Sequence, residues 1–156
     1  MKKIVLMMIT CLWICSNANS QELTSSQKAK ITSEINTLFE KNVKSAETLD
    51  VSGLTECVSD ALSAGFIEKG VYYQSFETLM KEFNNDIRGV KSQKMNISNK
   101  KITILSNNAA LITASGNYLV TLEDGRTLSG GFLWTFVYSQ VNGKWKVIHS
   151  HGSNSK

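Results

Sequence analysis

The sequence predicts a single α+β domain in which helices come first and an antiparallel sheet follows. Apolar residues recur at three- and four-residue intervals in the first half, and from residue 93 onward they alternate with polar residues. Turns at Asn107-Asn108, Asp124-Gly125 and Asn142-Gly143 then divide the second half into four strands, since these residue types tolerate the positive φ of tight hairpins. The length of 156 residues with 42% hydrophobic content fits one core.

The N-terminal segment has the pattern of a signal peptide. Lys2 and Lys3 precede an apolar run from Ile4 to Ile14, which is too short for a permanent membrane span. Small residues follow at Ala18 and Ser20, so we expect cleavage after Ser20 and a mature domain of residues 21–156. This predicts an exported protein, periplasmic or extracellular, with no membrane association after cleavage.

Charge and cysteine usage exclude several classes of partner. Removing Lys2 and Lys3 lowers the formal charge from +4 by two, and no stripe of basic and aromatic residues suits a phosphate backbone. We therefore expect no nucleic-acid partner. Only Cys57 remains after cleavage, so no internal disulfide is expected, and its apolar neighbours at helical spacing predict a buried packing role.

Three helices are predicted before the sheet. The first covers residues 24–49, and Asp50 is the expected N-cap of a second. Ser75 caps a third, which Gly89 stops, while Phe66 to Tyr73 is a strand or an extended connector. The expected inward residues are, in helix order, Ile31, Ile35, Leu38, Phe39, Val43, Ala46; Leu54, Cys57, Val58, Ala61; and Phe76, Leu79, Met80, Phe83, Ile87.

The last hairpin predicts an aromatic sheet face. A two-residue turn at Asn142-Gly143 pairs Val141 with Lys144. Counting back two residues at a time sets Tyr138 opposite Val147, Phe136 opposite His149 and Trp134 opposite His151. Side-chain alternation then gathers seven residues on one face, which the helices must cover: Trp134, Phe136, Tyr138, Trp145, Val147, His149 and His151.

The residues after this turn, G-K-W-K-V-I-H-S-H-G-S, resemble the closing motif of SnoaL-like domains of the nuclear transport factor 2-like superfamily. The element order resembles that family over nearly the whole mature chain. The resemblance implies a cone-shaped fold of three N-terminal helices packed on a curved, four- to six-stranded, mainly antiparallel sheet. It also implies a pocket between sheet and helices and frequent dimers through the sheet, but no single activity.

Candidate site residues follow from these two arguments. A dehydratase of the superfamily uses histidine, tyrosine and aspartate residues around its pocket. The same residue types occur in this chain at His149, His151, Asp60 and Tyr72, which are the catalytic candidates. The expected ligand-binding residues are Trp134, Phe136, Tyr138, Tyr118, Tyr73 and His149. Related association-type domains place anion-binding arginines where this chain has Gly116 and Phe136, so an apolar or neutral ligand is expected. We predict no metal and no cofactor, because the histidines lack a third ligand.

Three hypotheses of function stay open. The first is a noncatalytic exported domain that binds a small apolar molecule or self-associates. The second is a lyase or isomerase that uses the His, Tyr and Asp candidates for general acid/base chemistry on a carbonyl or polycyclic substrate. The third is a structural homodimer that buries the opposite sheet face, expected to carry Leu133, Thr135, Val137 and Ile148. The alternative to a catalytic role for the two histidines is a structural one, in which they close the open end of the cone.

Overall fold

The computed structural model describes residues 22–155 and confirms the α+β class. Helices α1 (Ser25–Glu47) and α2 (Val51–Cys57) come first, then two short strands, β1 (Phe66–Glu68) and β2 (Val71–Tyr73), and helix α3 (Phe76–Asp86). Four long strands follow, β3 (Val90–Ser106), β4 (Ala109–Leu122), β5 (Thr127–Val141) and β6 (Lys144–Ser155). The predicted signal peptide lies outside the described residues.

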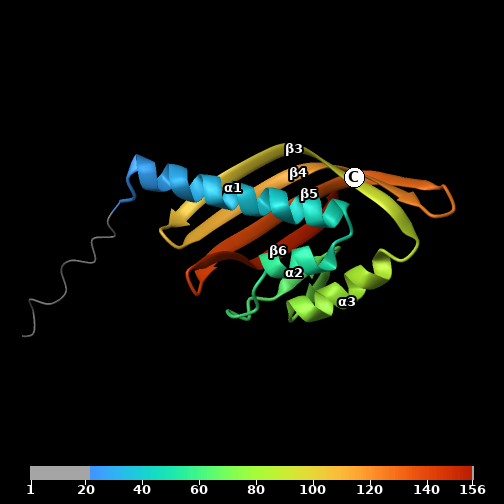
Figure 1. The fold of residues 1–156 in the computed structure, drawn as a ribbon, viewed down its shortest axis with the longest axis horizontal. Helices are drawn as coiled ribbons and strands as arrows, with labels where there is room; N and C mark the ends of the chain where they lie inside the picture. Colours follow the sequence, from blue (N-terminus) through green and yellow to red (C-terminus); the bar gives the residue numbers. More distant parts are fainter. Residues whose placement is uncertain (1–21, 156) are drawn as a thin grey trace, which may run out of the picture.

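Helix α1 builds the core. Its N-cap, Thr24, accepts a hydrogen bond from the Gln27 amide, and the Gln27 side chain accepts one from the Thr24 amide in return. Further along, Ile31, Ile35 and Phe39 are buried against the sheet. Their partners in the sheet are Ala110, Ile112, Ala114, Tyr138 and Val147. Figure 1 shows α1 lying across the long strands. We call the side of the sheet that α1 covers the inner face and the opposite side the outer face.

The six strands form one mixed sheet in the order β2-β1-β6-β5-β4-β3. All neighbours are antiparallel apart from β1 and β6, which run parallel. Strand β3 forms one edge, where its register against β4 shifts at three points. The predicted stretch Phe66 to Tyr73 is thus a short hairpin that extends the meander beyond β6.

All three predicted turns form, and two of them have the expected positive φ. Asn142 and Gly143 have φ values of 51° and 74° and join Val141 directly to Lys144. Gly125 likewise has a positive φ of 85°. The turn at Asn107 and Asn108 forms as predicted, but neither residue has a positive φ. Asn108 is fixed there by a hydrogen bond from its amide to the Ser106 hydroxyl.

Helix α2 is shorter than predicted but begins as expected. The Asp50 carboxylate accepts a hydrogen bond from the Gly53 amide at 2.9 Å, which confirms its role as N-cap. The helix ends at Cys57, so Ala61 lies beyond it in a turn. Cys57 is fully buried and free, as predicted, and burial raises the pKa of its thiol. A thiol held protonated in this way is a packing residue rather than a nucleophile.

A β-bulge in β6 corrects the predicted register of the last hairpin. Tyr138 pairs with Val147 as predicted, but the next residue back, Val137, pairs with His149, so Ile148 is an extra residue. The predicted pairs of Phe136 with His149 and Trp134 with His151 are therefore wrong. Phe136 pairs with Ser150, and Trp134 pairs with Gly152. One inserted residue exchanges the two faces of the strand beyond it.

Replacing Phe39 by alanine tests the core. The ring is 1% exposed and meets Phe136 edge to face with centroids 6.0 Å apart. Its loss removes buried apolar area and leaves a cavity, so we expect Phe39→Ala to lower the free energy of unfolding by about 3–5 kcal/mol. Urea denaturation measures this. Lys28→Ala, an exposed position on the same helix, is the control, and an equal effect of both changes would contradict this packing.

Candidate functional site

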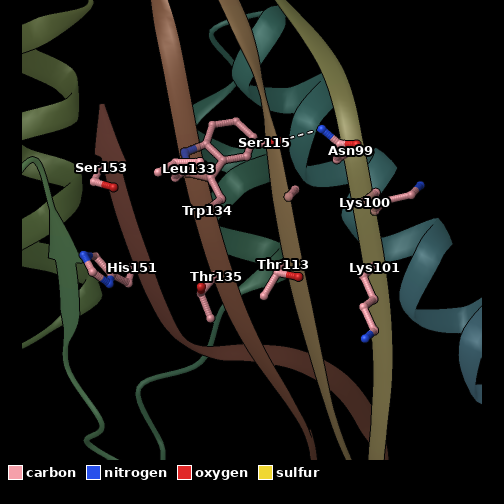
Figure 2. Close-up of a pocket in the computed structure, with 11 residues that line it drawn as sticks. Asn99, Lys100, Lys101, Thr113, Ser115, Leu133, Trp134, Thr135, His151 and Ser153 are labelled. Atoms are coloured by element: carbon pink, nitrogen blue, oxygen red, sulfur yellow. Dashed lines mark hydrogen bonds between the residues drawn. The ribbon is translucent and has the colours of Figure 1, made fainter. Parts of the chain in front are cut away.

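A hollow lies on the outer face of the sheet. It has a volume of about 610 Å³ and spans β3 to β6. Figure 2 shows Thr113, Thr135 and His151 on neighbouring strands along it. The lining is rich in hydroxyl and amide groups: Asn99, Lys100, Lys101, Thr113, Ala114, Ser115, Leu133, Trp134, Thr135, His151 and Ser153. This hollow is open to solvent on the side away from α1 rather than enclosed between sheet and helices.

The bulge places both histidines on the outer face. His149 pairs with Val137 and His151 with Thr135, whereas the core residue Ile112 pairs with Phe136 on the inner face. His149 is half-buried, and its Nδ1 lies 2.8 Å from the Gly65 carbonyl oxygen. A carbonyl only accepts, so Nδ1 donates. His149 thus fastens the segment before β1 to β6.

The other catalytic candidates do not join the histidines in one site. Both carboxylate oxygens of Asp60 accept from the Phe76 amide, at 2.9 and 3.0 Å, so Asp60 caps α3 beside Ser75. Tyr72 is 62% exposed on the edge strand β2. Its hydroxyl lies over Gly65, the residue that also contacts His149. Tyr72 and His149 therefore lie near each other because both contact Gly65, which is a structural role.

The predicted ligand-binding aromatic residues differ in access. Tyr138 is fully buried, and burial raises the pKa of its hydroxyl. That hydroxyl has no hydrogen-bond partner among the described residues. Phe136 packs between Phe39 and Trp134 in the core. Trp134 and Tyr118 stay half-buried on the inner face, and Tyr73 is half-buried on β2. Of this set, Trp134 and Tyr118 are the residues whose position suits contact with a ligand on the inner face; their binding role stays a prediction.

Gly116 shows why an arginine has no place at that position in this chain. A β-carbon there would lie 2.0 Å from the Asn96 carbonyl oxygen and 2.7 Å from the Phe132 ring. Phe132 is 3% exposed and stacks on Trp134 with ring centroids 4.0 Å apart. Aromatic surface thus takes the space that a basic side chain would need.

Glu68 is an inner-face carboxyl group that sequence reasoning missed. On β1 it pairs with Gly152, which pairs in turn with Trp134, so the three residues form one row across the sheet. The carboxylate lies against Gly152, with Oε2 only 2.0 Å from where a β-carbon would be. It receives no hydrogen bond from the described residues. The available signal was an acid within a stretch predicted as strand, Phe66 to Tyr73.

The electrostatics around Glu68 leave one negative charge unbalanced. Burial raises the pKa of its carboxyl group, the neighbouring Asp86 adds to this, and Lys69 and His151 oppose it. Lys69, however, pairs with Asp86 on α3 at 2.9 Å, and this pair raises the pKa of the Lys69 ammonium. Two carboxylates thus share one ammonium group. Among the described residues, no three His, Cys, Asp or Glu side chains meet closely enough to hold a metal ion.

Comparisons with known proteins assign the family. The model of the calcium/calmodulin dependent protein kinase II association domain matches residues 31–156, which is most of the chain. The chain belongs to this association-domain family. No match was found among curated proteins. Within residues 22–155, no helix is long and apolar enough to cross a membrane.

Solved structures share the fold of this association-domain chain. Hexachlorocyclohexane dehydrochlorinase LinA-type3 from Novosphingobium barchaimii is 15% identical with a TM-score of 0.72, over 85% of this chain and 92% of its own. A nuclear transport factor 2-like superfamily protein from Salmonella enterica is 18% identical, with a TM-score of 0.69 and coverages of 86% and 94%. A protein from Xanthomonas campestris assigned to the association domain is 19% identical, with a TM-score of 0.67 and coverages of 78% and 86%.

These neighbours confirm the resemblance to the nuclear transport factor 2-like superfamily. They include an enzyme as well as proteins with no stated activity, so the fold of the association-domain family does not by itself choose between the hypotheses.

Gly152→Ala tests the contact between Gly152 and Glu68 in this association-domain protein. The new methyl group must displace the carboxylate, which is the far end of a flexible side chain, so we expect the free energy of unfolding to fall by no more than about 1 kcal/mol. Shortening Glu68 to serine in the double variant is expected to remove most of that loss. Urea denaturation of the four proteins in this cycle measures both. Purely additive effects would show that the two side chains do not meet.

Glu68→Gln tests the burial of the carboxyl group. The pKa of Glu68 is raised in the folded protein, so the fold binds the proton more tightly than the unfolded chain does. Stability is therefore lost as the pH rises from the ordinary value of 4.5 through the raised value. We expect Glu68→Gln to be more stable than the parent at pH 7, with the difference vanishing below pH 4.5. Thermal unfolding across this range measures it, and a difference that does not change with pH would contradict the prediction.

Proposed function

We propose that this protein is a noncatalytic association domain whose outer sheet face binds the same face of a second copy. The observation that carries the proposal is the exposure of large apolar side chains there. Leu119 and Leu133 are 49% and 50% exposed on the outer face, on adjoining strands that flank the hollow. Large apolar side chains that are exposed on one sheet face favour burial against a partner. The association-domain family gives the partner that fits, a second copy of the chain.

The polar groups of the outer face suit a self-complementary interface. Hydroxyl groups of Thr113, Thr135 and Ser153 line the hollow and are able both to donate and to accept hydrogen bonds. In a dimer with a two-fold axis, these hydroxyl groups can therefore form hydrogen bonds with the same groups of the second copy. Strands β3 to β6 contain no Asp or Glu, and Lys94 and Lys101 lie on the outer face of β3, the edge strand. Because like charges repel each other, we place these two lysines at the rim of such an interface.

The alternative of a lyase or isomerase has less support from the geometry. Its histidines face the outer side of the sheet, and Asp60 is engaged as the cap of α3. General acid/base chemistry needs these groups within hydrogen-bond reach of one substrate. The candidate residues therefore support structure and association better than proton transfer.

A second candidate function is the binding of a small molecule on the inner face, beside α3. The apolar residues of α3, such as Leu79, Met80 and Phe83, are half-buried, and no residue of this helix is fully buried. Trp134 is half-buried as well. Apolar surface left partly open at this place is what favours a ligand there. We also propose export, with cleavage near Ser20, on the basis of the basic and apolar residues of the N-terminal segment.

Leu133→Lys tests the association. A charge at the centre of the proposed interface must be desolvated beside its symmetry mate, so we expect the dimer dissociation constant to rise at least tenfold, roughly 1.4 kcal/mol. Sedimentation equilibrium of the parent and the variant measures this. The control is Leu62→Lys, an apolar position that is also exposed, at 58%, but lies away from the sheet. A parent protein with the mass of one chain would refute the proposal.

A further inference from the structure

We propose that acid weakens the association of this protein, because His151 gains a positive charge within the interface between two copies. This inference deepens the proposed function and rests on it. It adds a regulatory property, dependence on pH, to the contact through the outer face. The histidines of the chain are His149 and His151, and the bulge in β6 places both on this face.

Position is the first argument. His151 is exposed and lines the outer-face hollow. One row of paired residues crosses this face, as Figure 2 shows: Lys101, Thr113, Thr135 and His151. Leu133, which carries the proposed contact, lies two residues before Thr135 on the same face of β5. A stable interface covers about 800 Å² of each partner, and neighbouring strands are only about 4.8 Å apart. An interface centred on Leu133 therefore covers His151 as well.

Charge is the second argument. Histidine is the type of side chain that changes charge between about pH 5 and pH 8. Strands β3 to β6 contain no Asp or Glu, so neither copy offers a protonated His151 a carboxylate from these strands. Lys94 and Lys101 add charges of the same sign, and His149 adds a second ring that gains a charge in acid. Contact between two copies then desolvates a positive charge that has no partner, which disfavours association.

The elements beside β6 do not remove this cost. On β5 the outer-face neighbours of His151 carry no titratable group: Leu133, Thr135 and Val137. On β1, Glu68 interacts with His151 through its charge. That carboxylate lies against Gly152 on the inner face, near the ion pair of Lys69 with Asp86 of α3. Because Glu68 has this position in the single chain too, association adds no new partner for the charged ring.

The direction of the pH dependence follows from this cost. A protonated His151 favours the single chain, where water surrounds the ring, and a neutral one favours the dimer. Association therefore releases protons, so the dimer is stabilised at neutral pH and weakened as the pH falls through the range in which histidine gains its charge.

The experiment measures the dimer dissociation constant by sedimentation equilibrium at about pH 7.5 and about pH 5.5, at one salt concentration. We expect the constant of the parent protein to rise about tenfold or more at the lower pH, because each copy contributes one ring. In His151→Gln, whose side chain stays uncharged, we expect this dependence to disappear. The matched control is Glu68→Gln, which keeps it. Burial raises the pKa of the Glu68 carboxyl group, but Glu68 lies outside the proposed interface.

The outcomes separate this inference from the function on which it rests. A parent protein that dimerises equally well at both pH values, or a dependence that His151→Gln retains, shows that the role of His151 is wrong while the association stands. A parent with the mass of one chain at both pH values shows that both are wrong. Circular dichroism at each pH checks that the proteins are folded, and His151→Asn replaces His151→Gln should that variant not fold.

Discussion

The arrangement of this protein depends on one inserted residue in its last strand. Ile148 has no partner in β5, and the pairing therefore changes phase between Val147 and His149. Before the bulge, Val147 faces α1 in the core; beyond it, the histidines face outward and Gly152 faces inward. At the same place the edge of β6 that faces away from β5 changes partner. It passes from an isolated bridge with Val58 to the parallel pairing with β1. The bulge thus lets this edge of β6 pair first with Val58 and then with β1.

This change of phase marks the limit of what the sequence could predict. The turn at Asn142-Gly143 fixes the register near it, and the pairing of Tyr138 with Val147 followed correctly from that turn. A bulge has no such signature in a single sequence, because the residues on both sides of it still alternate. Counting beyond Val147 therefore gave each histidine the wrong face, although the strand itself was correctly placed.

The helices were predictable for a different reason. Their caps are local, since Asp50 and Ser75 bind amides within three residues of themselves. The short hairpin of β1 and β2 depends instead on a distant partner, β6. Its acidic residue, Glu68, can be recognised as a candidate only from its position beside Gly152. Local chemistry thus fixed the elements, whereas the candidate site arises from contacts between residues more than eighty positions apart in the chain.

The long edge strand β3 has a consequence for how copies of the protein meet. A straight, uncharged edge would pair with the edge of any other copy and extend into a fibre. Here the register shifts and the basic residues Lys91, Lys94 and Lys101 interrupt that edge along its length. Open-ended growth through backbone hydrogen bonds is thereby blocked. Any contact between copies is thereby left to side chains on the sheet faces rather than to the backbone of this edge.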